Sequence, residues 1–395
     1  MGRSGGGNGA IRRKIQKSHK KRAEQTATFG RWSGWGWGVV VFGLAAAIAG
    51  YLANLDDHDH AKKEEVGAAW TRHPEAKVCE IQQLNSYPHD TKAFTQGLVI
   101  ENGALYESTG LYKQSELREV DLFSGRVLRS VSLDDDLFGE GLAFRSVEPQ
   151  LDQDDELEGE GLKHAATTQP TTQPGRLYQL TWREGVVLSY NANDFTPLAK
   201  DQEVEQPHNN HDHNKPKHQT HTIQGEGWGL TSHPDTGNFI LSNGTNILTY
   251  LDPETFKPTK HVHVKIREIG GSKMLPVGGI NELEYIDSMI YANVYGSDKM
   301  IIIDPDSGVV RYILDLDRTL VDHHQKHSRE AVLNGIAFDK EKRKMYITGK
   351  LWPAVYEVQM PDFSQCTYAS AYTKWKKKSA TTTTTTNNNE AESSR

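Results

Sequence analysis

The chain has 395 residues, and the residues AVILMFWYC make up 36% of it, a low share that indicates segments without a packed core. Its two cysteines exclude a disulfide-rich mini-domain and the zinc modules that need several cysteines. The net charge of -7 is unevenly spread, because residues 1–31 carry +8 and leave -15 on the remainder. So acidic a remainder repels phosphate, and nucleic acid is therefore not expected as a partner.

The amino-terminal segment predicts a membrane anchor. A basic arm at 1–34 precedes an uncharged stretch at 35–55, which as a helix would be about 31 Å long, enough to cross a bilayer. The positive arm is expected in the cytosol, so the rest of this single-pass type II protein would face the lumen of the secretory pathway (ER/Golgi) or the outside. A signal peptide cleaved after Ala49 gives the same topology, whereas an organellar transit sequence would change the compartment.

Strand-rich sequence follows a stalk at 56–77 and predicts a folded β domain at 78–375. Three stretches have no hydrophobic periodicity, and we expect them to be disordered, since so few apolar side chains do not offset the entropy of ordering the backbone. They are two insertions and a tail, at about 147–174, 201–222 and 376–395.

Five repeats organise the predicted domain. Each has a polar or aromatic residue, then usually Gly, then an aliphatic residue: Gln96-Gly97-Leu98, Glu140-Gly141-Leu142, Trp228-Gly229-Leu230, Asn281-Glu282-Leu283 and Asn334-Gly335-Ile336. A second shared string follows 10 to 12 residues later once the first insertion is deleted, and alternating strands around Gly or Pro turns come after it. About four strands in roughly 50 residues, without a helical pattern, predict an all-β, five-bladed β-propeller.

The last repeat supplies three strands, whereas residues 78–87 form a strand signal without a repeat. We expect this amino-terminal strand to complete the fifth blade and close the ring. Cys79 and Cys366 would then lie on or beside adjacent strands, where they either form a disulfide or remain two buried thiols.

The repeated register predicts one site on the axis, because the first strand of each blade lies nearest the axis and Gly lets the backbones approach. The residues brought together there are Gln96, Glu140, Trp228, Asn281 and Asn334. The equivalent positions of the second strings are Gly110, Trp182, Gly244, Tyr295 and Lys350. Polar side chains also line the wet channel of non-catalytic propellers, and periodicity alone does not separate the two cases.

Eight ordered motifs resemble a known family. They are YPHDTKAFTQGL, YESTGLYKQSELREVDLFSGRV, FGEGLA, LYQLTW, GWGLT, NELEY, YANVY, and VLNGIAFD followed by ITGKLWP, and they span about Tyr87 to Pro353. They are similar to the plant and bacterial type of glutaminyl-peptide cyclotransferase, the glutaminyl cyclase typified by the papaya latex enzyme. The resemblance implies a five-bladed propeller that converts amino-terminal Gln of peptides to pyroglutamate with release of ammonia. It implies no cofactor, unlike the zinc-dependent animal enzymes.

The chemistry of that reaction explains the residue types. The substrate amine has an unperturbed pKa of about 7.7 to 8.0 and must lose a proton, while the departing ammonia must gain one. One carboxyl can do both, and we assign Glu140 as this proton shuttle, with its pKa raised by aromatic neighbours. Asn281 and Lys350 are the expected donors to the oxyanion or carboxamide oxygen, and Gln96 is expected to orient the substrate amide.

The remaining assigned residues bind substrate. Phe94, Phe138, Trp182 and Trp228 are expected to wall the pocket, and the register adds Asn334 to the substrate-binding set. These positions match the motifs of the family. Tyr295 stands where the family usually has Trp, which leaves the third aromatic wall open.

Two other functions remain to be weighed. A catalytically silent propeller that holds peptides would keep the same cavity, and ammonia release from a Gln-initiated dipeptide separates it from the enzyme. A calcium-dependent hydrolase on a related propeller is disfavoured by the single central carboxylate. The histidine-rich stretch at 208–221 has irregular spacing, and the His pair at 323–327 has no supporting carboxylate. Adventitious metal binding is the alternative, but we interpret both as surface insertions and predict no metal site.

Overall fold

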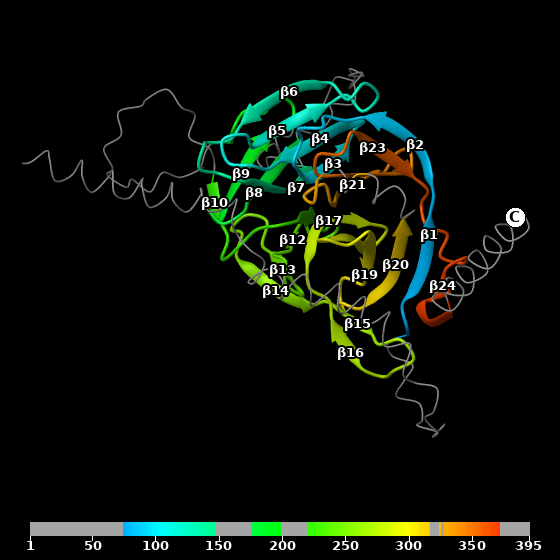
Figure 1. The fold of residues 1–395 in the computed structure, drawn as a ribbon. Coiled ribbons are helices and arrows are strands. Elements are labelled where there is room, and N and C mark those ends of the chain that lie inside the picture. Colours follow the sequence, from blue (N-terminus) through cyan, green and yellow to red (C-terminus); the bar gives the residue numbers. More distant parts are fainter. Residues whose placement is uncertain (1–73, 147–174, 199–219, 317–323, 325–327, 372–395) are drawn as a thin grey trace, which may run out of the picture.

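The chain forms a ring of five β-sheets in a computed structural model that describes residues 74–146, 175–198, 220–316, 324 and 328–371. The sheets follow one another around a common centre (Figure 1). Each blade has four strands that pair antiparallel in order from the axis outward, and the sheet of one blade continues into two further strands at its outer edge. The predicted all-β, five-bladed β-propeller is confirmed.

Four of the blades take their strands from consecutive chain segments. Blade 1 contains β3 (Thr95–Glu101), β4 (Ala104–Thr109), β5 (Glu116–Val120) and β6 (Val127–Ser132). Blade 2 contains β7 (Gly139–Ser146), β8 (Gly175–Thr181), β9 (Val186–Asn191) and β10 (Thr220–Thr222). Blade 3 contains β11 (Leu230–Ser232), β12 (Phe239–Leu241), β13 (Ile247–Leu251) and β14 (Pro258–His263). Blade 4 contains β17 (Ile280–Ile286), β18 (Met289–Val294), β19 (Lys299–Ile303) and β20 (Val310–Leu316), after a hairpin of β15 (Lys265–Arg267) and β16 (Met274–Pro276).

Blade 5 joins the two ends of the domain. It contains β21 (Leu333–Asp339), β22 (Lys344–Gly349) and β23 (Ala354–Val358), with the amino-terminal strand β2 (Gln83–Pro88) as its outermost strand. β2 pairs antiparallel with β23, from Gln83 opposite Val358 to Pro88 opposite Ala354. The predicted closure of the last blade by the amino-terminal segment is therefore confirmed.

The prediction of a single strand at 78–87 is wrong in one respect, because the segment divides at Gln82. Its first part, β1 (Lys77–Ile81), pairs in parallel with β20 of blade 4, with Cys79 opposite Leu314. Val78, Cys79 and Ile81 are buried, whereas most of β2 is exposed. The apolar half of the segment thus covers the outer edge of blade 4, and the polar half serves as the outer strand of blade 5.

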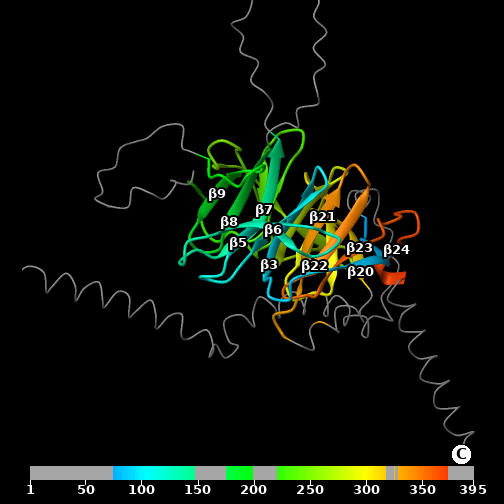
Figure 2. The ribbon, with the colours of Figure 1, turned by 90° about the horizontal axis from the view of Figure 1, so that it is seen from above.

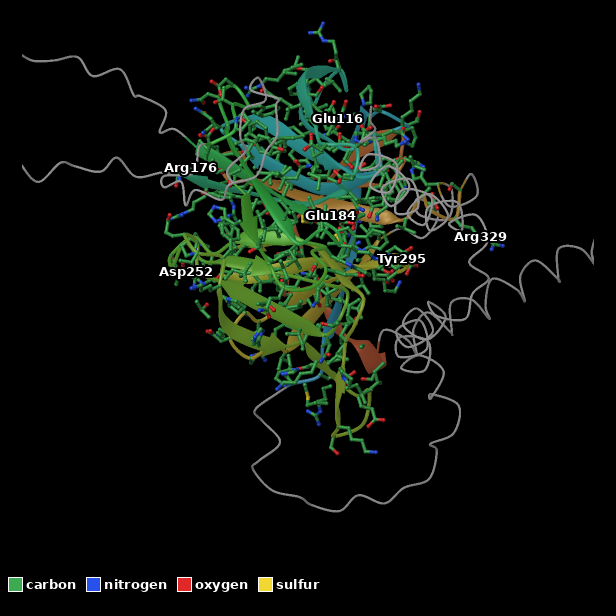
Figure 3. The ribbon with its side chains drawn as sticks, turned by 90° about the vertical axis from the view of Figure 1, so that its left-hand side faces the viewer. Glu116, Arg176, Glu184, Asp252, Tyr295 and Arg329 are labelled. Carbon is green, nitrogen blue, oxygen red and sulfur yellow. A yellow bond between two sulfur atoms is a disulfide. The ribbon has the colours of Figure 1, made fainter. Side chains whose placement is uncertain are left out.

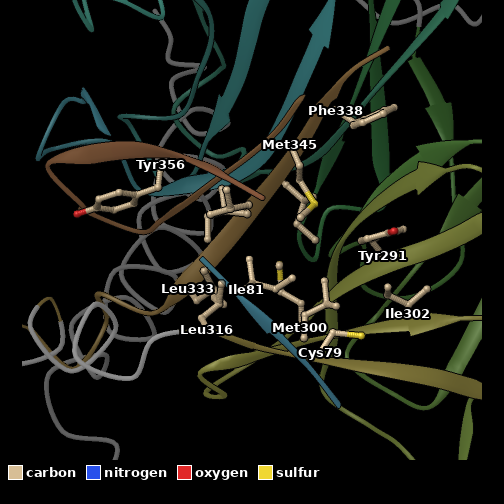
Figure 4. Packing of buried hydrophobic residues seen from close by; sticks show 14 of the residues in the cluster. Cys79, Ile81, Tyr291, Met300, Ile302, Leu316, Leu333, Phe338, Met345 and Tyr356 are labelled. Carbon is tan, nitrogen blue, oxygen red and sulfur yellow. The ribbon is translucent and has the colours of Figure 1, made fainter. Parts of the chain in front are cut away.

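Cys79 and Cys366 form a disulfide, which decides between the two alternatives left open by the sequence. The short strand β24 (Thr367–Tyr368) pairs antiparallel with β1 and brings Cys366 beside it. Both cysteines belong to an apolar cluster between blades 4 and 5 that includes Met300, Leu333 and Tyr356 (Figure 4). The bond links two positions 287 residues apart and so holds together the two ends of the folded domain.

Packing between neighbouring blades forms the core, in five apolar clusters that each join two adjacent blades. The innermost strands contact one another in the order β3, β7, β11, β17, β21 and back to β3, and Figure 2 shows β3, β7 and β21 from a second direction. A side chain at Gly97 or Gly141 would overlap the backbone of Leu142 or Leu230 in the next blade. This close approach is why Gly follows the first residue of the three-residue motif, here called the marked residue, in four of the five repeats.

Several predicted boundaries shift slightly. The second insertion was expected to extend to residue 222, but Thr220–Thr222 pair with Val186–Leu188 as β10 and complete blade 2. At the other end of the domain, β1 begins one residue earlier than expected, and Ala76 of the predicted stalk is buried. His324, within the histidine-rich stretch expected on the surface, is also buried and stacks on Trp352.

The basic arm at 1–34, the anchor at 35–55, the first insertion and the tail at 376–395 lie outside the described residues. Within the ranges that the structure describes, no helix is both long and apolar enough to cross a membrane.

Candidate active site

A β-bulge marks the start of four of the five innermost strands. The pairing register shifts between Thr95 and Gly97, between Gly139 and Leu142, between Ile280 and Leu283, and between Leu333 and Ile336. The residues inside these irregularities include Gln96, Glu140, Asn281 and Asn334, four of the five marked residues. Because a bulge adds a residue and re-aims side chains, these residues leave the ordinary alternation of their strands at the same end of the ring.

A repeated backbone hydrogen bond connects the second string of a repeat to its first motif. The amide N–H of the equivalent residue in the second string donates to the carbonyl of the residue two positions before the marked residue. These bonds run from Gly110 to Phe94, from Trp182 to Phe138, from Tyr295 to Gly279 and from Lys350 to Val332, at 2.8–3.0 Å. In four of the five blades, the two sets of repeat positions predicted from sequence are therefore held together at one end of the blade. Figure 3 shows Tyr295 on the opposite side of the molecule from Arg176 and Asp252.

Glu140 lies in this set as a buried carboxyl with a neutral partner. The side-chain amide of Gln96 donates a hydrogen bond of 2.9 Å to its Oε1. Asn334 in turn donates to the carbonyl of Thr95 at 3.0 Å and approaches Oε1 of Gln96 at 3.5 Å. Burial raises the pKa of Glu140 well above its ordinary value, and the positive charge of Lys350 only partly opposes this effect. Asn334, Gln96 and Glu140 thus form a chain of contacts across blades 5, 1 and 2.

Lys350 is buried among aromatic rings. Its ammonium nitrogen lies 4.7 Å from the ring centroid of Phe94 and 5.7 Å from that of Tyr295. Burial lowers the pKa of Lys350, while the charges of Glu140 and Glu330 raise it. The ring faces therefore replace part of the hydration that the ammonium loses, and its charge interacts with that of Glu140.

Asn281 contributes a buried carboxamide from blade 4. Its backbone carbonyl accepts a hydrogen bond of 2.6 Å from Ser242, and it packs against Gly229 next to Trp228. The side-chain Oδ1 atoms of Asn281 and Asn334 have no hydrogen-bond partner in the described part of the chain. Buried amide groups of this kind leave hydrogen-bonding capacity for a substrate.

The aromatic wall is formed by rings from four neighbouring blades. Phe138 packs against Phe94, Tyr112 and Trp182 with ring centroids 5.3–6.2 Å apart. Trp228 contacts Tyr295 edge-on at 5.9 Å, so Tyr295 supplies a ring at the position that the sequence left open. Gly110 and Gly244 leave room for neighbouring rings, because a Cβ there would overlap Phe138 and Trp228, respectively.

Three wall residues were missed by the sequence analysis. Leu111 and Tyr112 pack on the aromatic cluster, and the hydroxyl of Tyr112 donates to Glu184 at 2.9 Å. Glu226 accepts hydrogen bonds from the indoles of both Trp182 and Trp228. None of the three lies at a marked repeat position, and for Leu111 and Tyr112 the available signal was only that they directly follow Gly110.

Every residue predicted for the site is thus placed at this end of the ring, and the contacts above connect Glu140, Gln96, Asn334, Lys350 and the aromatic wall. Their individual roles stay predictions. The arrangement combines a carboxyl of raised pKa, a buried ammonium, carboxamides and apolar rings, which are suited to proton transfer and oxyanion stabilisation away from water.

Comparison with known proteins gives a consistent result. A family model described as glutamine cyclotransferase matches residues 55–148 and 145–360. A glutaminyl-peptide cyclotransferase of Arabidopsis thaliana is 33% identical over 293 residues, which are 73% of this chain and 73% of that protein. The crystal structure of Myxococcus xanthus glutaminyl cyclase is 31% identical, with a TM-score of 0.53, and the match covers 73% of this chain and 99% of the bacterial one.

Proposed function

The chain belongs to the glutamine cyclotransferase family, and we propose that it acts as a glutaminyl-peptide cyclotransferase in which Glu140 carries the proton between the two nitrogens of the reaction. It converts the amino-terminal glutaminyl residue of a peptide to pyroglutamate and releases ammonia. The observation that carries the assignment of Glu140 is its burial at the axis, with a raised pKa and a neutral hydrogen-bond donor as partner.

The reaction proceeds within one substrate molecule. The α-amine of the terminal Gln attacks its own side-chain carbonyl carbon, so that a C–N bond forms and the bond to the amide nitrogen breaks. Glu140 accepts the proton that the amine loses and returns it to the departing nitrogen, which leaves as ammonia. A carboxyl whose pKa lies above its ordinary value matches both half-steps better than an ordinary carboxylate, because it both accepts and returns the proton readily.

The other site residues support that step. The Lys350 ammonium and the Asn281 carboxamide are assigned to the oxygen that becomes negative in the tetrahedral intermediate, where one good donor contributes about 3 to 4 kcal/mol. Gln96 both holds Glu140 and faces the substrate amide. The rings of Phe94, Phe138, Trp182, Trp228 and Tyr295 fold the substrate side chain back and exclude water, and Asn334 contributes its unpartnered oxygen.

Ammonia release tests this proposal. We expect release from a dipeptide with amino-terminal Gln and none from its N-acetylated form, which has no free amine. Glu140→Gln should lower kcat by about 10²- to 10⁴-fold, while Glu254→Gln, which changes an exposed carboxylate paired with Arg145, should not. A wild-type protein that binds the dipeptide without releasing ammonia would instead be the silent peptide-binding propeller. Near-normal turnover by Glu140→Gln would contradict the assignment of the proton shuttle.

We further propose that residues 35–55 anchor the protein in a membrane of the secretory pathway, with the propeller on the luminal or outer side. The uncharged stretch and the basic arm support this placement, and so does the Cys79–Cys366 disulfide, since such bonds persist in oxidising compartments. In sealed microsomes, added protease should leave the propeller intact until detergent is present. Digestion without detergent would contradict the topology.

A further inference from the structure

Glu226 connects the two tryptophans of the aromatic wall. It lies in the loop between β10 and β11, and its Oε2 accepts hydrogen bonds from Nε1 of Trp182 at 3.0 Å and from Nε1 of Trp228 at 3.1 Å. These indoles belong to different repeats, one following β8 and the other preceding β11. A single carboxylate oxygen therefore fixes the edges of two rings that are not otherwise tied by a common strand.

The surroundings of Glu226 keep it in this position. The amide of Gly227 donates to the carbonyl of Trp182 at 2.9 Å, which joins the loop to the wall through the backbone. The other carboxylate oxygen of Glu226 pairs with Nε of Arg183 at 3.1 Å, and the guanidinium of Arg183 lies 3.8 Å from the ring centroid of Trp182. Trp182 is thus held at its edge by Glu226 and over one face by Arg183.

We propose that Glu226 is a positioning residue of the cyclisation, which sets the orientation of both indoles so that the folded-back Gln side chain is held against them. This inference rests on the proposed function. An indole with its N–H free would rotate or turn its polar edge toward the substrate, because a buried N–H requires a partner. The carboxylate thereby directs the apolar faces rather than the polar edges to the bound side chain.

The charge of Glu226 also acts on the site from a distance. The charged groups that face Glu140 are Lys350, Glu226 and Glu184, of which the two carboxylates add to the effect of burial in raising the pKa of Glu140. Glu184 accepts from the Tyr112 hydroxyl and contacts neither indole N–H. The pair Glu226 and Glu184 therefore separates the effect of charge, which both share, from the effect of holding the indoles, which Glu226 has.

Three variants measured with a Gln-initiated dipeptide test the proposal. Glu226→Ala removes the acceptor of two indoles and should raise KM about five- to tenfold. Glu226→Gln keeps an amide oxygen in reach of both N–H groups and should restore KM to within about twofold of wild type. Glu184→Gln should leave KM near wild type. Both Gln variants should move the acid limb of the kcat/KM profile to lower pH, because loss of a negative neighbour lowers the pKa at which Glu140 ionises.

The outcomes separate this inference from the function on which it rests. If wild type releases no ammonia, the proposed function fails and Glu226 is not the cause. If wild type is active and Glu226→Ala keeps its KM, or if Glu226→Gln and Glu184→Gln raise KM as much as Glu226→Ala does, the positioning role is wrong. Equal melting temperatures of the three variants show that any change in KM is not a loss of folded protein.

Discussion

Glu107 in β4 and Glu140 in β7 are both enclosed by the ring, with 1% and 5% of the residue exposed. Burial by itself raises the pKa of either carboxyl, because it disfavours the charged form. For Glu140 that effect prevails. For Glu107, His89 and Arg118 more than offset burial and hold the pKa below its ordinary value. Equal burial in the same ring thus gives one carboxyl that gains a proton readily and one that stays ionised.

The difference lies in the partners. The carboxylate of Glu107 accepts a hydrogen bond of 2.8 Å from the hydroxyl of Thr95 and lies 2.9 Å from Nε2 of His89. The other ring nitrogen of His89 lies 2.8 Å from the carbonyl of Trp352, which only accepts, so that nitrogen donates. Both ring nitrogens thus face acceptors, which favours the imidazolium form: burial lowers the pKa of His89, but Glu107 more than offsets this and raises it. A charged partner makes a structural ion pair at the seam of blades 1 and 5, whereas a neutral amide partner leaves Glu140 available for proton transfer.

Removal of the charge should therefore have opposite consequences at the two sites. Glu107→Gln leaves a buried cation without its counter-ion and should reduce the free energy of unfolding by about 3–5 kcal/mol. Glu140→Gln removes a carboxyl whose ionisation burial disfavours, so its free energy of unfolding at neutral pH should stay at or above that of wild type. Urea unfolding of both variants at neutral pH measures the difference. Equal losses of stability at the two sites would contradict the comparison.

Glu282 extends the comparison to a third buried carboxyl. It stands where the other repeats have Gly, and its Oε2 accepts the amide of Ile336 at 2.9 Å. The amide of Leu98 also bonds to it, and burial raises its pKa well above the ordinary value. Glu282→Leu should cost about 1–3 kcal/mol for the amides left unpaired in blades 5 and 1. Glu282→Gln retains an acceptor and should stay within about 0.5 kcal/mol of wild type; a loss equal to that of the Leu variant would show that the ionised group is the stabilising one.

The sequence predicted the blades and the site from the same physical requirement. Inner strands that approach closely need Gly, and this need repeats in every blade except the fourth, so the marked residues stood out in the sequence. The register then located Gln96, Glu140, Asn281 and Lys350 without any pairing information.

Features without a repeat were not predictable in the same way. The division of 78–87 at Gln82 depends on the exposed edge of β20, more than 220 residues later, which no local pattern reports. β10 is only three residues long and depends on its ladder to β9 rather than on its own composition. Glu226 lies two residues before a marked position, and only the fold brings it to both indoles.

The smallest expected effect is a change in how stability depends on pH. A raised folded pKa makes His89 stabilising below its unfolded value of 6.5, and this contribution is lost as pH rises through the folded pKa. The lowered pKa of Glu107 makes it stabilising above its unfolded value of 4.5, and that contribution is lost as pH falls through the folded pKa. The ion pair therefore stabilises most between these two values.

The contribution of Glu140 to the pH dependence of stability is opposite in sign to that of Glu107. Because the pKa of Glu140 is raised in the folded state, stability falls as pH rises above 4.5 toward the folded pKa. His89 adds a decline of its own that begins above pH 6.5, as pH rises toward its folded pKa. Glu140→Gln should flatten the decline that begins above pH 4.5, and His89→Gln the decline that begins above pH 6.5, each by at most about 1.4 kcal/mol per pH unit. Unfolding measured from about pH 4 to about pH 9 resolves the two contributions; a Glu140→Gln curve parallel to wild type throughout would mean that Glu140 is ionised like Glu107.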